Sequence, residues 1–86
     1  LDPVDVVVSK LKTFRAGDLD DIRAMADRLL LNPSRLVERF QLAKEHWLMD
    51  SRAPELKQYI ENLHMIQRDY LFVKETPIEL PDWLDS

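Results

Sequence analysis

The acidic residues near position 20 are the group in this sequence whose types and spacing best suit chemistry. Asp18-Leu19-Asp20 is its only Asp-x-Asp pair, and Asp21 follows directly. Carboxylate pairs can hold Mg²⁺ ions that bridge phosphate groups. At a helix start, however, the side chains of Asp18 and Asp20 diverge by about 200° around the axis. The spacing therefore favours helix caps and macrodipole partners over a metal site.

Other catalytic or metal-binding arrangements have less support. The chain has no cysteine, no Gly-x-Ser-x-Gly element and no glycine-rich loop, so neither hydrolase nor P-loop chemistry is indicated. His46 and His64 fall on different predicted helices, whereas structural zinc needs four converging ligands. We predict no metal, no cofactor and no catalytic residue in this chain, which on its own is not an enzyme.

A basic cluster precedes the aspartates and raises the question of nucleic-acid binding. Lys10, Lys12 and Arg15 surround Phe14, but Lys10 and Arg15 lie about 140° apart on a helix. The net charge is −4, while binding to phosphates needs a basic face. A helix-turn-helix reading fails because the helix after Gly17 opens with aspartates, which repel phosphate. The sequence therefore disfavours a nucleic-acid partner.

Two helices are predicted to position these residues. Asp2-Pro3 is an N-cap followed by proline, and the first helix runs to Phe14, with Gly17 as its left-handed C′ residue. The second helix begins at Asp18, with Asp21 in the capping-box position. The apolar residues of the two helices recur at helical spacing: Val4, Val7, Val8, Leu11 and Phe14, then Leu19, Ile22, Met25, Ala26, Leu29 and Leu30.

Two further helices and a tail follow. Asn32-Pro33 repeats the cap and opens a helix to about Met49, and a linker at 50–53 leads to a helix of about 20 residues from Pro54. Their apolar positions are Leu36, Val37, Phe40, Ala43, Trp47 and Leu48, then Leu56, Tyr59, Ile60, Leu63, Ile66 (or Gln67), Tyr70 and Val73.

Residues 76–86 are predicted to form an extended tail, because two prolines disfavour helix there. Its apolar residues are too many to leave in water, and we expect them to pack on the helices or on another chain. The candidate interface residues are Ile78, Leu80, Trp83 and Leu84.

The composition agrees with an all-α fold. The 86 residues include one glycine, with 45% hydrophobic and 33% charged residues, which suits a folded helical domain. We predict a small antiparallel bundle of about four helices over residues 1–75, with the tail at 76–86. No apolar run approaches the roughly 20 residues that span a bilayer, and the start Leu1-Asp2-Pro3 lacks the basic n-region of a signal peptide. We expect a cytoplasmic protein without membrane contact, and a start at Leu1 is compatible with a fragment or processed form.

The first third of the chain resembles a known family. Leu1-Asp2-Pro3-Val4-Asp5, Ser9-Lys10-Leu11, a turn with Arg15, and Asp18-Leu19-Asp20-Asp21-Ile22 follow one another. This order is similar to the helical region after the catalytic domain of bacterial nucleotidyltransferase-like proteins related to abortive-infection toxins.

The resemblance implies that Lys10 approaches a nucleotide phosphate, and that Arg15, Asp18 and Asp21 lie near the mouth of the active site. The Gly-Ser turn and strand-borne Asp-x-Asp pair of that family, which would bring Mg²⁺ and a nucleoside triphosphate to the parent protein, do not occur here.

Two functions follow. The first is a non-catalytic helical accessory domain that packs on a catalytic domain absent from this chain. The second is a stand-alone protein-interaction or homodimerisation module, in which Trp83 and its apolar neighbours form the interface. In both, the partner is a protein.

Overall fold

The computed structural model describes residues 2–51 and 53–85, which form an all-α domain. It contains four α-helices, and no β-strand occurs within these ranges, so the predicted fold class is confirmed. Leu1, Arg52 and Ser86, which the sequence predictions place at the start of the resemblance, in the linker and in the tail, lie outside the described residues.

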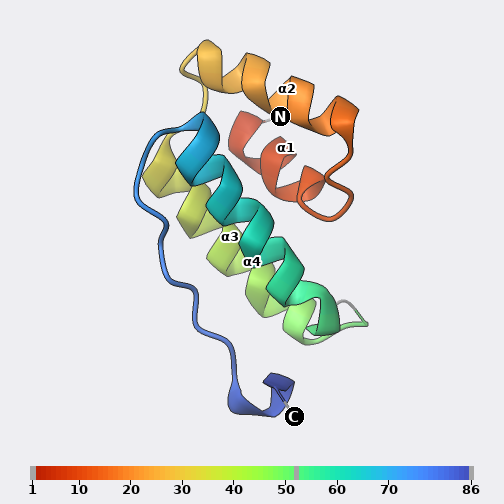
Figure 1. Ribbon diagram of the computed structural model, residues 1–86. Coiled ribbons are helices and arrows are strands. Elements are labelled where there is room, and N and C mark those ends of the chain that lie inside the picture. The colour runs from red at the N-terminus through yellow and green to blue at the C-terminus, as the bar shows by residue number, and fades with distance from the viewer. Residues whose placement is uncertain (1, 52, 86) are drawn as a thin grey trace.

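The four helices form two antiparallel pairs (Figure 1). Their bounds are α1 Pro3–Lys10, α2 Ala16–Asp27, α3 Pro33–Leu48 and α4 Leu56–Met65. A 3₁₀ turn, η1 (Ala53–Glu55), leads into α4, and a π-helical turn, η2 (Ile66–Tyr70), continues it. α1 packs on α3, and α2 contacts η2, so the first pair lies at the end of the second pair where α3 begins.

Two of the predicted caps are present as the sequence indicated. The carboxylate of Asp2 accepts a hydrogen bond from the N–H of Val4 at 2.9 Å, and the side chain of Asn32 accepts one from Arg35 at 3.1 Å. The Arg35 guanidinium also donates to Asp2, which ties the start of α3 to the start of α1. The cap-then-proline pattern therefore fixes both helix starts and, through Arg35, their mutual position.

The core is formed by the apolar faces of all four helices. Phe40, Trp47 and Tyr59 make an edge-to-face row with ring centroids 5.8 and 5.1 Å apart, which joins α3 to α4. The other buried hydrophobic side chains are Val4, Val7, Val8, Leu11, Ile22, Leu31, Leu36, Ala53, Leu56, Ile60, Leu63 and Ile66.

The α1–α2 junction differs from the sequence prediction. α1 ends at Lys10, before Phe14, and α2 begins at Ala16, so Gly17 lies inside a helix and not at a C′ position. The prediction of Asp18 as N-cap with Asp21 in the capping box was also wrong. Asp18 is the third residue of the helix, and its carboxylate accepts from the N–H at the N-cap position. An aspartate can accept hydrogen bonds from the free N–H groups of a helix start either as the N-cap residue or as the third residue of the helix. The local sequence does not distinguish these two positions.

Three turns after helices use a left-handed backbone at residues other than glycine. Phe14, Leu29 and Phe72 have φ values of 49°, 58° and 55°. After α2, the N–H of Leu30 bonds to the C=O of Met25 at 3.0 Å, the pattern of a helix end that usually places glycine where Leu29 lies. The predicted second helix included Leu29 and Leu30 in its apolar face, but both side chains are exposed.

The fourth predicted helix is present but is not a single regular α-helix. The N–H of Leu71 bonds to the C=O of Ile66, five residues back, at 2.9 Å, which widens the last turn. The adjacent residues Ile66 and Gln67, at the start of this turn, both lie in the interior, where they are 0% and 1% exposed. The helical stretch ends at Tyr70, before the predicted Val73. Across the described ranges, no helix has the length and apolarity needed to cross a membrane.

The tail is extended only in part. Residues 76–81 contain no regular helix or strand, in agreement with the prediction, but a 3₁₀ turn, η3 (Asp82–Asp85), follows. Residues 71–75, which the prediction kept in the helical bundle, also contain no regular helix or strand. The N–H of Leu84 donates to the C=O of Pro81 at 3.1 Å within this turn. The fixed φ angle of proline suits the first positions of such a turn. Pro81 therefore excludes a long helix and at the same time favours the start of this short one.

Replacement of Leu29 by glycine is expected to stabilise the fold. The side chain is 90% exposed, so little packing is lost, and the left-handed backbone of a residue with a Cβ costs about 1–2 kcal/mol. Part of this gain in stability is offset, because glycine has greater conformational freedom than leucine in the unfolded chain. We expect the free energy of unfolding in urea to rise by about 0.5–1 kcal/mol.

The control for this prediction is Leu29→Ala, which removes the same exposed side chain but keeps the Cβ. It is expected to leave stability nearly unchanged. An equal gain in the alanine and glycine variants would contradict backbone strain as the cause.

Candidate functional site

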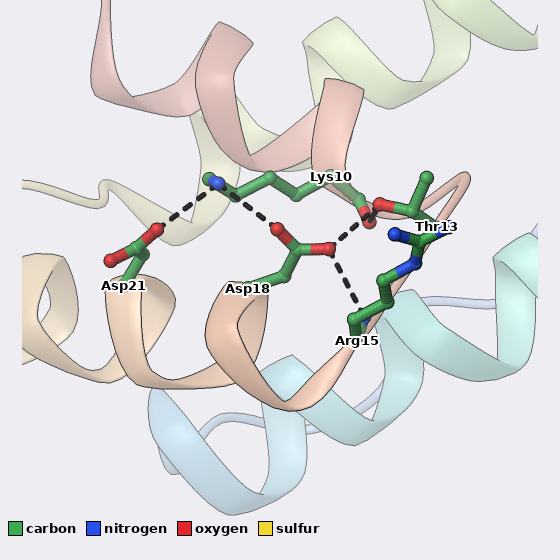
Figure 2. A network of polar contacts seen from close by, with 5 residues as sticks. All are labelled: Lys10, Thr13, Arg15, Asp18 and Asp21. Atoms are coloured by element: carbon green, nitrogen blue, oxygen red, sulfur yellow. Dashed lines mark hydrogen bonds and ion pairs between the residues drawn. The ribbon is translucent and has the colours of Figure 1, made fainter.

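The structure brings together the four residues that the resemblance places near a nucleotide. Lys10 projects from the end of α1 towards Asp18 and Asp21 on α2, and Thr13 and Arg15 lie in the connecting turn (Figure 2). Thr13 was not predicted as a member of this group. Its position one turn after Lys10, within reach of the next helix start, is the only sequence signal for it.

Asp18 is the centre of the cluster. Its Oδ1 accepts from the Nζ of Lys10 at 3.1 Å, and its Oδ2 accepts from the Thr13 hydroxyl at 2.7 Å and from the N–H of Arg15 at 3.0 Å. The Thr13 hydroxyl, followed by the Arg15 N–H and Lys10, lowers the pKa of Asp18 to about 2. Asp18 therefore carries its negative charge throughout the physiological range.

Lys10 lies between two carboxylates. Besides its bond to Asp18, its Nζ is 3.2 Å from Oδ2 of Asp21. The hydrogen bonds to Asp18 and Asp21 raise the pKa of Lys10 above its ordinary value. A phosphate or a Mg²⁺ ion would have to displace these contacts to bind here, so the cluster is arranged to hold the α1–α2 turn.

The remaining polar candidates do not form a site with this cluster. Asp20 is exposed on α2, His46 is exposed on α3, and His64 on α4 directs Nε2 to the C=O of Thr76 at 2.8 Å. Within residues 2–51 and 53–85, no three His, Asp or Glu side chains are grouped to hold a metal ion.

A second candidate surface lies where α2 and η2 end. Leu29 and Phe72, 90% and 81% exposed, border a hollow of about 400 Å³. The hollow is lined by Ala26, Asp27, Leu29, Leu31, Pro33, Tyr70, Leu71 and Phe72. We call this the Leu29–Phe72 surface. The sequence analysis did not identify this surface. The signal for it is the absence of glycine after α2 and after η2, where Leu29 and Phe72 lie.

The four predicted interface residues divide into two groups. Ile78, Leu80 and Leu84 are half-buried against the core of their own chain, whereas Trp83 remains 59% exposed. The tail therefore packs on the helices, which is one of the two arrangements expected from its apolar content.

Three buried polar residues were not predicted, and each contacts main chain far away in sequence. The side-chain amide of Asn62 donates to the C=O of Leu11 at 3.1 Å, which joins α4 to the end of α1. Lys44 donates to the C=O of Glu79, and the side-chain oxygen of Gln67 accepts from the N–H of Thr76, both in the tail. Such residues look like ordinary surface positions in the sequence because their partners are 9–51 residues distant.

Comparisons with known proteins add no relative to this description. No protein-family model matches the chain, and neither a curated protein nor a solved structure matches it.

The Asp18 cluster predicts a defined acid response. A carboxyl with a lowered folded pKa stabilises the fold above its unfolded pKa, and this contribution is lost as the pH falls through the folded pKa. For Asp18 the window extends from the ordinary value of 3.8 down to about 2. We expect Asp18→Asn to be less stable than the native chain near neutral pH, with the difference narrowing across this window.

Urea unfolding at about pH 6, 4 and 2.5 measures this difference. Asp20→Asn is the matched control, because it removes the same charge from an exposed residue outside the cluster. A constant difference in the free energy of unfolding between Asp18→Asn and the native chain at all three pH values would contradict a lowered pKa of Asp18.

Proposed function

We propose that this chain is a non-catalytic helical accessory domain that packs on the catalytic domain of a nucleotidyltransferase-like protein. The partner, not this chain, binds Mg²⁺ and the nucleoside triphosphate. The similarity of Asp2–Ile22 to the helical region of that family supports the proposal, in which the pair is cytoplasmic.

The contacts of the Asp18 cluster support a structural role for the family-like residues. Lys10 is engaged by two carboxylates, and both oxygens of Asp18 accept hydrogen bonds. These side chains fix the angle between α1 and α2, and through it the position of the end of α2. In this proposal they shape the docking surface and do not act on a substrate.

The Leu29–Phe72 surface is the observation that carries the proposal. A single exposed leucine is ordinary, but two large apolar side chains here border one hollow lined by Leu31, Tyr70 and Leu71. Both also have a backbone conformation that glycine would adopt with less strain. Apolar side chains held exposed on a strained backbone contribute most to binding, when a partner protein covers them. The hollow has room for an apolar side chain of the catalytic domain.

Affinity capture from cells that encode this chain, followed by mass spectrometry, tests the proposal. The captured protein is expected to contain a Gly-Ser turn followed by an Asp-x-Asp pair. Leu29→Ser combined with Phe72→Ser should reduce its recovery by about tenfold or more, because apolar anchors dominate interfaces. Leu42→Ser is the control, since Leu42 is 67% exposed and does not line the hollow.

Three results would overturn the proposal. The first is a captured partner without the Gly-Ser turn and Asp-x-Asp pair, and the second is unchanged recovery with the double variant. The third is nucleotidyl transfer by the purified chain supplied only with Mg²⁺ and nucleoside triphosphates.

A further inference from the structure

The C-terminal tail follows the α3–α4 pair like a bound peptide. It leaves η2, runs along the pair and ends beside the opposite end (Figure 1). Ile78 and Leu80 are half-buried against the core, whereas Pro77 and Glu79, which alternate with them, are exposed; Leu84 in η3 is also half-buried. This alternation is that of an extended segment lying on an apolar surface.

The start of the tail is held by a set of directional contacts to Thr76. The Gln67 amide donates to the Thr76 hydroxyl at 3.1 Å and accepts from the Thr76 N–H at 3.1 Å. Nε2 of His64 lies 2.8 Å from the C=O of Thr76, so this nitrogen carries the donated hydrogen. Gln67 is only 1% exposed, and the tail thus satisfies a buried amide.

A second contact holds the middle of the tail. Nζ of Lys44, a residue only 9% exposed, donates to the C=O of Glu79 at 3.0 Å. We call the surface formed by Lys44, His64 and Gln67 the tail-binding face. Its polar groups bind mainly the tail's backbone, which is how proteins capture extended peptides.

The turn that leads into the tail is strained. Phe72 lies between η2 and the tail with φ of 55° and is 81% exposed. A residue with a Cβ rarely adopts this conformation, because the Cβ lies too close to the following carbonyl oxygen. The turn at residues 71–75 is also short, and it determines which copy of the chain supplies a tail to a given tail-binding face. Short, strained connections favour the exchange of elements between copies.

We propose that two copies of this chain form a dimer by exchanging residues 76–84. Each tail occupies the tail-binding face of the other copy and re-forms the contacts of Thr76, Glu79 and the apolar residues. The turn at 71–75 opens, which releases the strain at Phe72. This inference concerns residues 71–84 and shares only Phe72 with the proposed docking surface. Its tests use the purified chain without a catalytic-domain partner, so their failure is distinct from a failure of the accessory role.

Light scattering coupled to size exclusion gives the first test. The native chain is expected to show a dimer fraction that increases with concentration. Phe72→Gly should lower that fraction by about tenfold at equal concentration, because glycine removes the strain that opening releases. Phe72→Ala is the matched control: it loses the same exposed ring but keeps the Cβ, and it should dimerise like the native chain.

Isotope-filtered NMR on dimers formed from labelled and unlabelled full-length chains identifies the exchanged segment. Contacts between copies are expected from Ile78 and Leu80 to α3 and α4. Contacts between copies at Leu29 and Phe72 alone would overturn the proposal, as would a strict monomer at every concentration. Equal loss of dimer in the glycine and alanine variants would also overturn it.

Discussion

The scarcity of glycine is the constraint on which much of this structure depends. The only glycine, Gly17, lies inside α2, so the left-handed turns after helices fall to Phe14, Leu29 and Phe72. Each of these bulky residues marks a place that matters for the arrangement of the chain: the α1–α2 junction, the end of α2, and the start of the tail. The strain is distributed over three connections, and the buried core of the four helices and the polar contacts between them hold it in place.

The Asp18 cluster compensates for the lack of a glycine at the first of these connections, the α1–α2 junction. Glycine would allow the chain to turn freely after α1, whereas here three donors converge on one carboxylate and hold the turn in a single form. Lys10 and Asp21 extend the same set of contacts across the two helices. The residues that the family resemblance associates with a nucleotide are thus the residues that determine local geometry. A resemblance in sequence can therefore reflect a shared turn between two helices as well as a shared chemistry.

The parts of the fold that depend on neighbouring residues were predictable. Asp2-Pro3 and Asn32-Pro33 cap their helices as expected, because cap and helix are adjacent in sequence. The shift of α2 towards Ala16 was not predictable, since the Asp18 carboxylate bonds backwards to the N–H of Arg15. The contacts of the tail with Lys44 and Gln67 were missed for a different reason. They depend on segments that meet only after the helices have packed, and the polar character of both residues suggests an exposed position.

The π-helical turn has a consequence for how the last helical stretch meets the tail. The stretch ends with this turn at Tyr70, and Gln67, its second residue, keeps the spacing of the buried residues Ile60 and Leu63. The C=O of Gln67 accepts from the N–H of Val73 at 2.8 Å, and its side-chain amide contacts Thr76. One residue therefore determines both where the helix stops and where the tail begins. A substitution at Gln67 is expected to change these two features together.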